Sequence, residues 1–202
     1  MEAQKNYDKL ANSFFDSFKI TPLLEADLTT TWKEFSSTEG KYRIQFPGTP
    51  FQWSLPLEML RTPSTFYFTA YASSGQYTVM YMDYAETPSA TDPAALKVFL
   101  DDLREGQKDR QEQTGGKLTV VSETDITFDG YPGRFLVADL NGIAIVRVKT
   151  VVVKTRVYWI TALMPRDDPK GSDPKVYEKL AIKFISSFSL MREAVKQQRG
   201  LE

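Results

Sequence analysis

The sequence predicts an α+β fold, an antiparallel sheet of about six to eight strands covered by helices on both sides (an α/β/α sandwich). Segments in which apolar and polar residues alternate, as in strands, outnumber segments with helical periodicity. Most of them are joined by tight turns, which favour antiparallel neighbours. One long helix interrupts the strands and a second follows them, an order typical of helices packed on a sheet. The 202 residues, 42% of them hydrophobic, are enough to bury one core.

The N-terminal residues 1–20 are predicted to form a helix that is separate from the main domain. The stretch from Tyr7 to Ile20 repeats the stretch from Tyr177 to Leu190, with seven of fourteen aligned residues identical. Such a spacing indicates one domain length between two copies. We therefore interpret residues 1–20 as the remnant of a preceding, similar domain. The alternative is a chance similarity between two amphipathic helices.

The first half of the main domain is predicted to be a meander of strands. The apolar period becomes two from Trp32 onward, after a linker over residues 21–31, and turn residues interrupt it repeatedly. The expected strands are Lys33–Ser37, Tyr42–Phe46, Gln52–Arg61, Thr65–Ser73 and Tyr77–Tyr84.

A long helix is expected over residues 93–112, because Asp92-Pro93 supplies an N-cap followed by a proline at the first helical position. Its apolar residues Leu96, Phe99, Leu100 and Leu103 define one narrow face. The charged residues Asp101, Asp102, Arg104, Lys108, Asp109 and Arg110 are expected to face away from the sheet.

The second half is predicted to contain four long strands and a closing helix. Asn141-Gly142 is the clearest hairpin turn, and Asp129-Gly130 is another. Asp173-Pro174 repeats the cap-plus-proline signal of the first helix. The expected elements are strands Leu118–Thr127, Gly133–Leu140, Ile143–Val153 and Arg156–Met164, a helix over 174–186, and a short strand over Phe188–Leu190.

The composition excludes several classes of function. The chain has no cysteine and no histidine, which excludes disulfides, thiolate nucleophiles, imidazole bases and Cys/His zinc sites. Its 25 basic and 26 acidic residues balance, so no overall field attracts nucleic acid. No apolar run is long enough to span a bilayer. Residues 191–202 are interpreted as a charged tail that ends in a cloning scar, Leu201-Glu202.

Several groups of residues resemble reactive sites without the required spacing. The acidic loop 166–173 lacks the ligand spacing of a calcium loop. Asp101 and Asp102 are adjacent on a helix and so point about 100° apart. Gly115-Gly116 and Gly130–Gly133 fit turns better than phosphate loops. We therefore expect no catalytic, cofactor-binding or metal-binding residue and no enzymatic activity.

Two further sets allow a binding interpretation. Basic residues on one hairpin could contact an anion, although they fit a solvent-facing register or edge protection better. Tyrosines in the meander could form a binding surface, although cross-strand packing is the simpler interpretation. The basic set is Arg147, Lys149, Lys154 and Arg156, and the tyrosines are Tyr67, Tyr71, Tyr77, Tyr81 and Tyr84.

The stretch from Trp32 to Pro50, WKEFSSTEGKYRIQFPGTP, resembles the opening of uncharacterised bacterial, often cyanobacterial, domains with a W-x-E-F-S-S-x-E-G-x-F-x-V-x-F-P-G-x-P pattern. Their closing F-x-x-S-F-x-L pattern is matched by Phe184 to Leu190. Such domains are similar to the α/β/α sandwich of PsbP, DcrB and the Ran-binding Mog proteins. The resemblance spans about 32–190 and implies the fold rather than a function. The metal binding of PsbP-type proteins relies partly on histidine, so the resemblance implies no metal here.

These observations favour a non-catalytic protein-interaction module of a larger, tandem-domain bacterial protein. Its sheet face or loops would bind another protein, and no cofactor or nucleic acid is expected. The alternatives are a small-ligand or lipid carrier and, less in keeping with the composition, a hydrolase with unconventional residues. Without its own sheet, the N-terminal helix could also pair two chains as a homodimer. The localisation stays open, extracytoplasmic and membrane-associated positions included.

Overall fold

The computed structural model describes residues 31–53, 65–72, 75–89, 91–113, 115–166 and 174–191. The expected N-terminal helix over 1–20, most of the linker and nearly all of the tail lie outside the described residues. So do residues 54–61 of the expected strand Gln52–Arg61. Neither of the two described helices is long and apolar enough to cross a membrane.

The described strands form two antiparallel sheets. The main sheet has seven strands in the order β3-β4-β5-β9-β8-β7-β6 and the small sheet has three in the order β1-β2-β10. The small sheet consists of β1 (Lys33–Ser37), β2 (Tyr42–Phe46) and β10 (Ser189–Leu190). The main sheet consists of β3 (Phe51–Trp53), β4 (Thr65–Ala72), β5 (Gly75–Asp83), β6 (Leu118–Phe128), β7 (Tyr131–Leu140), β8 (Ala144–Val153) and β9 (Arg156–Pro165).

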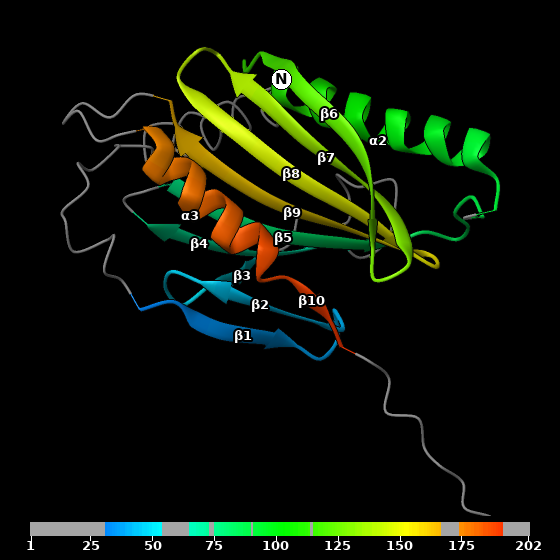
Figure 1. The fold of residues 1–202 in the computed structure, drawn as a ribbon, viewed down its shortest axis with the longest axis horizontal. Coiled ribbons are helices and arrows are strands. Elements are labelled where there is room, and N and C mark those ends of the chain that lie inside the picture. Colours follow the sequence, from blue (N-terminus) through cyan, green and yellow to red (C-terminus); the bar gives the residue numbers. More distant parts are fainter. Residues whose placement is uncertain are drawn as a thin grey trace, which may run out of the picture.

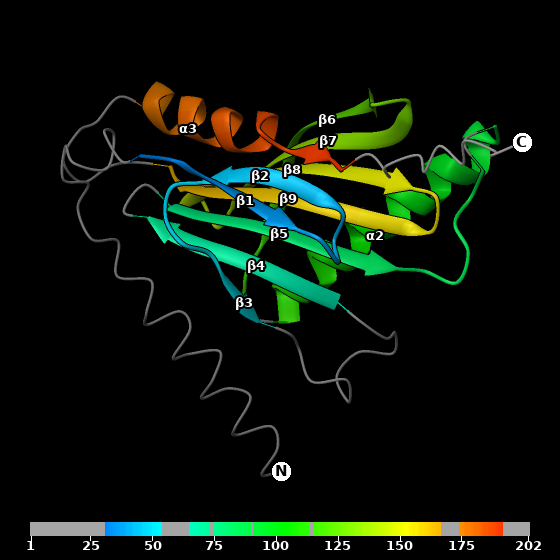
Figure 2. The same cartoon turned by 90° about the horizontal axis from the view of Figure 1, so that it is seen from below.

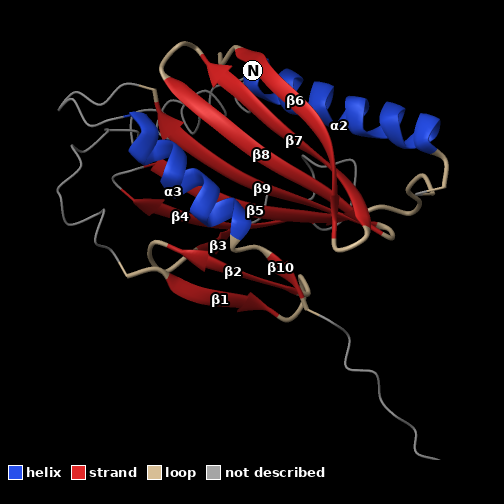
Figure 3. Ribbon diagram, viewed as in Figure 1, coloured by secondary structure: helices blue, strands red, loops and turns tan. Residues whose placement is uncertain are grey.

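The two helices lie on opposite faces of the main sheet (Figures 1 and 2). Helix α3 (Pro174–Ser186) shares its face with the small sheet, and α2 (Pro93–Gln113) covers the other face. Figure 3 shows how far strands outweigh helices. The predicted α+β class is therefore confirmed. The three-stranded sheet is an addition: β1 and β2 pair with β10 instead of extending the meander.

Each face of the main sheet carries its own apolar core. On the α3 face, Tyr77, Tyr81 and Ile160 pack beneath the small sheet and the helix, and Phe184 and Phe188 close the cluster. On the α2 face, Leu100 and its neighbours pack on the strands, with Trp159 1% exposed. The alternation of a strand sends successive side chains to opposite faces, which is why β9 supplies both cores.

An arginine joins the small sheet to the main one. Arg156 of β9 binds Asp83 of β5 through two hydrogen bonds of 2.5 and 2.6 Å and donates a third, 2.7 Å long, to the carbonyl of Glu39. The Tyr158 hydroxyl donates to the carbonyl of Gly40 at 2.7 Å. A side chain at Gly40 would lie 2.6 Å from the Tyr42 ring, so close packing requires glycine there.

The hairpin at Asn141-Gly142 forms where the sequence predicts it. Both residues have positive φ, 55° and 72°, as this turn requires. The loop is one residue longer than expected, because the paired residues are Leu140 and Ala144. The Asn141 side chain also accepts a 2.6 Å hydrogen bond from the amide of Lys117.

The interpretation of the basic residues on β8 and β9 as a solvent-facing or edge-protecting set is wrong for Arg147, Lys149 and Arg156. Strand β8 lies inside the sheet, between β7 and β9, and so is not an edge. Its odd-numbered positions face the α3 side, where the helix and the small sheet cover them. Lys149 is consequently only 9% exposed, and Arg147 lies 3.6 Å from Glu178 of α3. Lys154 alone of the four lies in a turn and is exposed.

The expectation that Ile143–Val153 is covered on both faces holds for β8. Its Val146 and Val148 pack in the α2-side core, and Val151 packs in the α3-side core. The tyrosine interpretation as packing holds for Tyr77 and Tyr81, which are 0% and 1% exposed.

Candidate functional site

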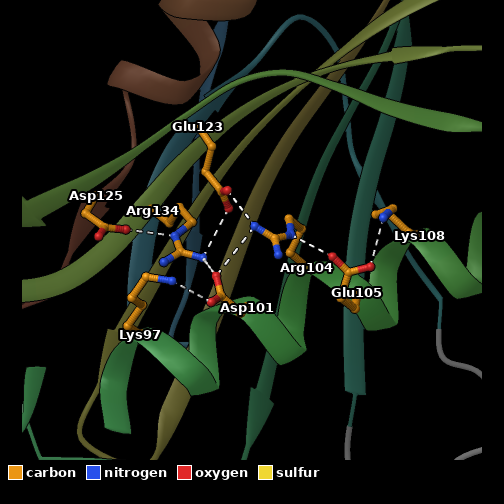
Figure 4. Close-up of polar contacts among 8 residues, drawn as sticks. All are labelled: Lys97, Asp101, Arg104, Glu105, Lys108, Glu123, Asp125 and Arg134. Atoms are coloured by element: carbon orange, nitrogen blue, oxygen red, sulfur yellow. Dashed lines mark hydrogen bonds and ion pairs between the residues drawn. The ribbon is translucent and has the colours of Figure 1, made fainter. Parts of the chain in front are cut away.

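A cluster of charged side chains lies between α2 and the outer strands β6 and β7 (Figure 4). Its centre is Arg134 of β7, which is 5% exposed. One terminal nitrogen of Arg134 lies 2.6 Å from Asp101 of α2 and 3.1 Å from Glu123 of β6. Its Nε lies 2.8 Å from Asp125 of β6. Arg134 thus joins a helix and two strands.

A second arginine extends the cluster along α2. Arg104 contacts Glu123 at 2.6 Å and Glu105 at 2.9 Å. Two lysines complete it, Lys97 at 2.8 Å from Asp101 and Lys108 at 2.8 Å from Glu105. Four carboxylates therefore meet four basic groups, and the cluster carries no net charge.

Within this cluster, the charged forms of Asp101, Glu105 and Arg134 are stabilised by their partners. Hydrogen bonds from Lys97 and Arg134 lower the pKa of Asp101 to about 2. Hydrogen bonds from Lys108 and Arg104 lower the pKa of Glu105. Burial opposes the charge of Arg134, but its bonds to Asp125 and Asp101 outweigh burial and raise its pKa. A general acid or base needs a pKa near the working pH, and these groups are moved away from it.

The expectation that all the charged residues of the long helix face away from the sheet is therefore wrong for Asp101 and Arg104. Their side chains are 29% and 23% exposed and point toward β6 and β7. Asp102 and Asp109 are exposed, as expected. The helix can turn Asp101 inward because Arg134 offers it a partner beside the apolar stripe. The sequence does contain a signal for this cluster. Arg134 interrupts a mostly apolar strand, and the strand before it carries Glu123 and Asp125.

Strand β6 borders this cluster and is the outermost strand of the main sheet. Among the described residues it pairs only with β7. Seven of its eleven residues are exposed, including Val120 at 38% and Val121 at 63%. A β-bulge leaves Val121 without a partner on β7. The amide and carbonyl groups along the outer side of an edge strand can pair with another chain.

The two carboxylates of β6 differ in how many of their oxygens have hydrogen-bond partners. Both oxygens of Glu123 have arginine partners, Oε1 with Arg134 and Oε2 with Arg104. Asp125 uses Oδ1 for Arg134, while its Oδ2 has no hydrogen-bond partner among the described residues. Its side chain is 67% exposed. Asp125 therefore offers a carboxylate oxygen at the rim of the sheet.

Lys149 is a buried ammonium on the α3 side of the sheet. Its Nζ lies 3.5 Å from the centre of the Phe128 ring and 6.0 Å from that of Phe188. No carboxylate lies within ion-pair distance among the described residues. Burial lowers its pKa to about 8, and the charge of Asp129 only partly opposes this. We assign Lys149 to packing and to a cation–π contact rather than to a reaction.

Open grooves lie outside the cores in the described part of the chain. One, of about 510 Å³, lies where the segment after β5 passes the β6–β7 and β8–β9 turns. It is lined mainly by apolar atoms of Ala85, Pro88, Pro132 and Val152, with Lys154 at its rim. Another follows the lysine-rich outer face of α3. The acidic loop considered above lies outside the described residues beyond Arg166.

Comparison with known proteins supports the fold. No family model and no curated protein matches the sequence. A solved structure, the cyanobacterial PsbP (CyanoP) of Synechocystis, is similar with a TM-score of 0.58 and 11% identity, covering 80% of this chain and 93% of that one. The fold is PsbP-like. At this identity the likeness concerns the fold alone.

Two other solved structures are more distant. A Bacteroides thetaiotaomicron protein has a TM-score of 0.37 and 11% identity, covering 80% of this chain and 49% of that one. PA94 of Pseudomonas aeruginosa, described as a protein of unknown function and putative regulator, has a TM-score of 0.36 and 14% identity, covering 75% and 94%. These scores are too low to support an argument. The PsbP-like resemblance seen in the sequence is thus confirmed at the level of fold, and the narrower motif family is not.

Proposed function

We propose that this chain is a non-catalytic protein-interaction module that adds an extended segment of a partner protein to the β6 edge of its main sheet. The observation that carries the proposal is the open edge itself. Strand addition uses the backbone groups of an edge for affinity and the neighbouring side chains for specificity.

The β6 edge has few of the features that protect edge strands. Natural edges are commonly short, covered, or interrupted by lysine or proline. Strand β6 has eleven residues, LTVVSETDITF, with no lysine, arginine or proline, and its protective features are the bulge at Val121 and the carboxylates of Glu123 and Asp125. The opposite edge, β3, is described over only three residues. Among the described residues, β6 is therefore a long edge that offers a template for a partner strand.

The charged cluster supports a binding role for this edge. Arg134 ties β6 and β7 to α2, so the edge is held in place before a partner arrives. A preorganised surface loses less conformational entropy on binding. The same cluster lowers the pKa of Asp101 and Glu105, which favours binding over proton transfer at these two carboxylates.

The test is a selection of extended peptides on the full chain, followed by amide hydrogen exchange of the complex. We expect enriched peptides to protect alternate amides of β6, because every second backbone amide of an edge strand points outward. The control is Val121→Pro, which removes an amide at the bulge, a position where proline is tolerated. Peptides bound near residue 121 should lose affinity on this variant. Enriched peptides that protect other elements, or no enrichment at all, would contradict the proposal.

A small-ligand carrier is the second candidate, and the 510 Å³ groove favours it. Its volume lies within the usual range of ligand pockets, roughly 300–1,000 Å³. Its walls are mainly apolar and Lys154 could meet an acidic head group. The groove is open, whereas carriers bury most of their ligand, so it ranks below the edge.

A fluorescent fatty acid distinguishes the two candidates. Binding that is lost in Ala85→Glu, which places a charge on an exposed part of the groove wall, would favour the carrier. Esterase, phosphatase and protease substrates should stay unhydrolysed under either candidate. Turnover that disappears on replacing one buried side chain would contradict both.

A further inference from the structure

We propose that the β6 edge selects a partner strand with a lysine or arginine next to Asp125 and β-branched residues on either side of it. This inference rests on the proposed function and names the class of partner that the same edge accepts. It follows from which carboxylate is still open and from the alternation of side chains along β6.

The basic residue is fixed to one position because the two carboxylates of β6 are unequal. Both oxygens of Glu123 already face arginines. Within the described part of the chain, Asp125 keeps Oδ2 without a hydrogen-bond partner, and its side chain is 67% exposed. A cross-strand cation beside Asp125 gains an ion pair, while one beside Glu123 meets a carboxylate that is already neutralised. The edge therefore has a single charge-selective position.

The neighbouring positions prefer β-branched side chains. Register with β7 places Asp125 opposite Arg134, on the α2 face, and places Thr124 and Ile126 opposite Phe135 and Gly133, on the other face. β-branched residues pack well against one another across strands. Successive side chains of an incoming strand would thus point alternately to the face of Thr124 and Ile126 and to the face of Asp125.

The same charges argue against a second copy of this chain as the occupant. In an antiparallel pair of two β6 strands centred on Thr124, Glu123 of each copy would lie opposite Asp125 of the other. Like charges directly opposite each other are destabilising. A basic strand of a different protein fits the edge better.

Three peptides test the inference on the full chain by NMR titration. The first is acetyl-Ser-Thr-Val-Lys-Val-Thr-Ser-amide, whose symmetric pattern makes strand direction irrelevant. The second replaces its lysine with glutamate. The third keeps the lysine and replaces both valines with proline, which removes backbone donors but retains the charge. We expect the lysine peptide to shift the β6 amides and to bind at least about threefold tighter than the glutamate peptide.

Asp125→Asn is the decisive variant, because it removes the charge and keeps the shape. The preference for lysine over glutamate should fall toward one in this variant, while Glu123→Gln should leave most of it. Sedimentation of the free chain reports self-pairing. Lysine and glutamate peptides that bind β6 equally well, or a preference that survives Asp125→Asn, would overturn the inference and leave strand addition standing. Three results would overturn strand addition as well. They are equally tight binding of the first peptide and of its proline-containing analogue, dimerisation of the chain through β6, and no shift of the β6 amides with any peptide.

Discussion

At the residue scale, similar side chains have opposite roles according to their surroundings. Arg134 and Lys149 are both buried cations on neighbouring strands. Arg134 has three carboxylate partners, which compensate for its lost hydration and raise its pKa. Lys149 faces aromatic rings instead, and burial lowers its pKa. The charge of Arg134 therefore stabilises the fold, whereas burying the charge of Lys149 lowers the free energy of unfolding.

Replacing Lys149 with methionine is expected to stabilise the protein at neutral pH. The folded state holds the pKa of Lys149 at about 8, below its ordinary value of 10.5. The unfolded state therefore binds more protons between these values, and stability from this group rises with pH across that window. At about 1.4 kcal/mol per pKa unit, Lys149→Met should raise the free energy of unfolding by about 1–3 kcal/mol at pH 7.

The gain should shrink as pH rises from about 8 to 10.5, because the wild-type lysine then becomes neutral when unfolded too. Urea unfolding of the wild type and of Lys149→Met across this pH range measures the gain in the free energy of unfolding. The tyrosines contribute equally to both, so the difference isolates Lys149. Lys179→Met, on the exposed face of α3, is the control and should change little. A pH-independent difference would show that Lys149 is not desolvated.

These residue environments could be predicted only in part. Tyr77 and Tyr81 pack as their alternation predicts. The burial of Lys149 could not be predicted, because it depends on β10 and the β6–β7 turn meeting over β8. Local periodicity does not report which layer covers a strand. The site at Asp125 was also missed, because it matters only if β6 is an edge strand. Local periodicity does not report the position of a strand in the sheet.

At the scale of elements, α2 is held by two different kinds of interaction. Leu100 and its apolar neighbours pack on the sheet, as the 3.6-residue period predicts. Asp101 and Arg104, on the flank of that stripe, bind Arg134 and Glu123. The sequence predicts the apolar residues of this helix face correctly. The predicted sheet-facing surface is nevertheless too narrow, because every charged residue of the helix was expected to be exposed.

Replacing Arg134 with methionine is expected to loosen α2. It leaves Asp101, Glu123 and Asp125 close together without their shared cation, and breaking a buried ion pair costs roughly 3–5 kcal/mol. Since all three carboxylates are partly exposed, we expect the lower end of that range. Hydrogen exchange should rise first in α2 and β6, while α3 stays protected.

The pH dependence gives a second measure of this variant. In the wild type the pKa of Asp101 is lowered to about 2, so its contribution is complete above about pH 4 and is lost as pH falls toward 2. Arg134→Met should lose less stability over that range. Arg134→Lys keeps the charge and should be intermediate, because lysine cannot bind in two directions as arginine does. Uniform exchange in all elements would contradict a local role at α2.

At the scale of the whole molecule, turn residues and periodicity predict the layers well. Most strand and helix bounds agree with the structure to within one or two residues, because Asp92-Pro93, Asn141-Gly142 and similar signals act locally. The split into two sheets was not predicted, because β10 follows β2 by more than 140 residues. Pairing between such distant segments leaves no local pattern.

The internal repeat coincides with the part of α3 and β10 that is buried. Four of the seven identical positions, Tyr177, Ala181, Phe184 and Phe188, are no more than 4% exposed. A fifth, Ser187, accepts a 2.9 Å hydrogen bond from the amide of Gln45 in β2. The interpretation of residues 1–20 as the closing helix of a similar domain stays a prediction, because those residues lie outside the described part of the chain.

If that interpretation is right, the sequence from Tyr7 to Ile20 should work in the place of α3 and β10. We expect a chimera in which it replaces the segment from Tyr177 to Leu190 to fold. The change at Ile185, which becomes phenylalanine in a buried position, should account for most of a loss of about 1–3 kcal/mol. Circular dichroism and thermal unfolding measure the outcome. The control has the same residues in an order that keeps helical amphipathicity but moves the identical positions. If chimera and control lose the same stability, the match reflects a shared apolar stripe and the tandem-domain interpretation fails.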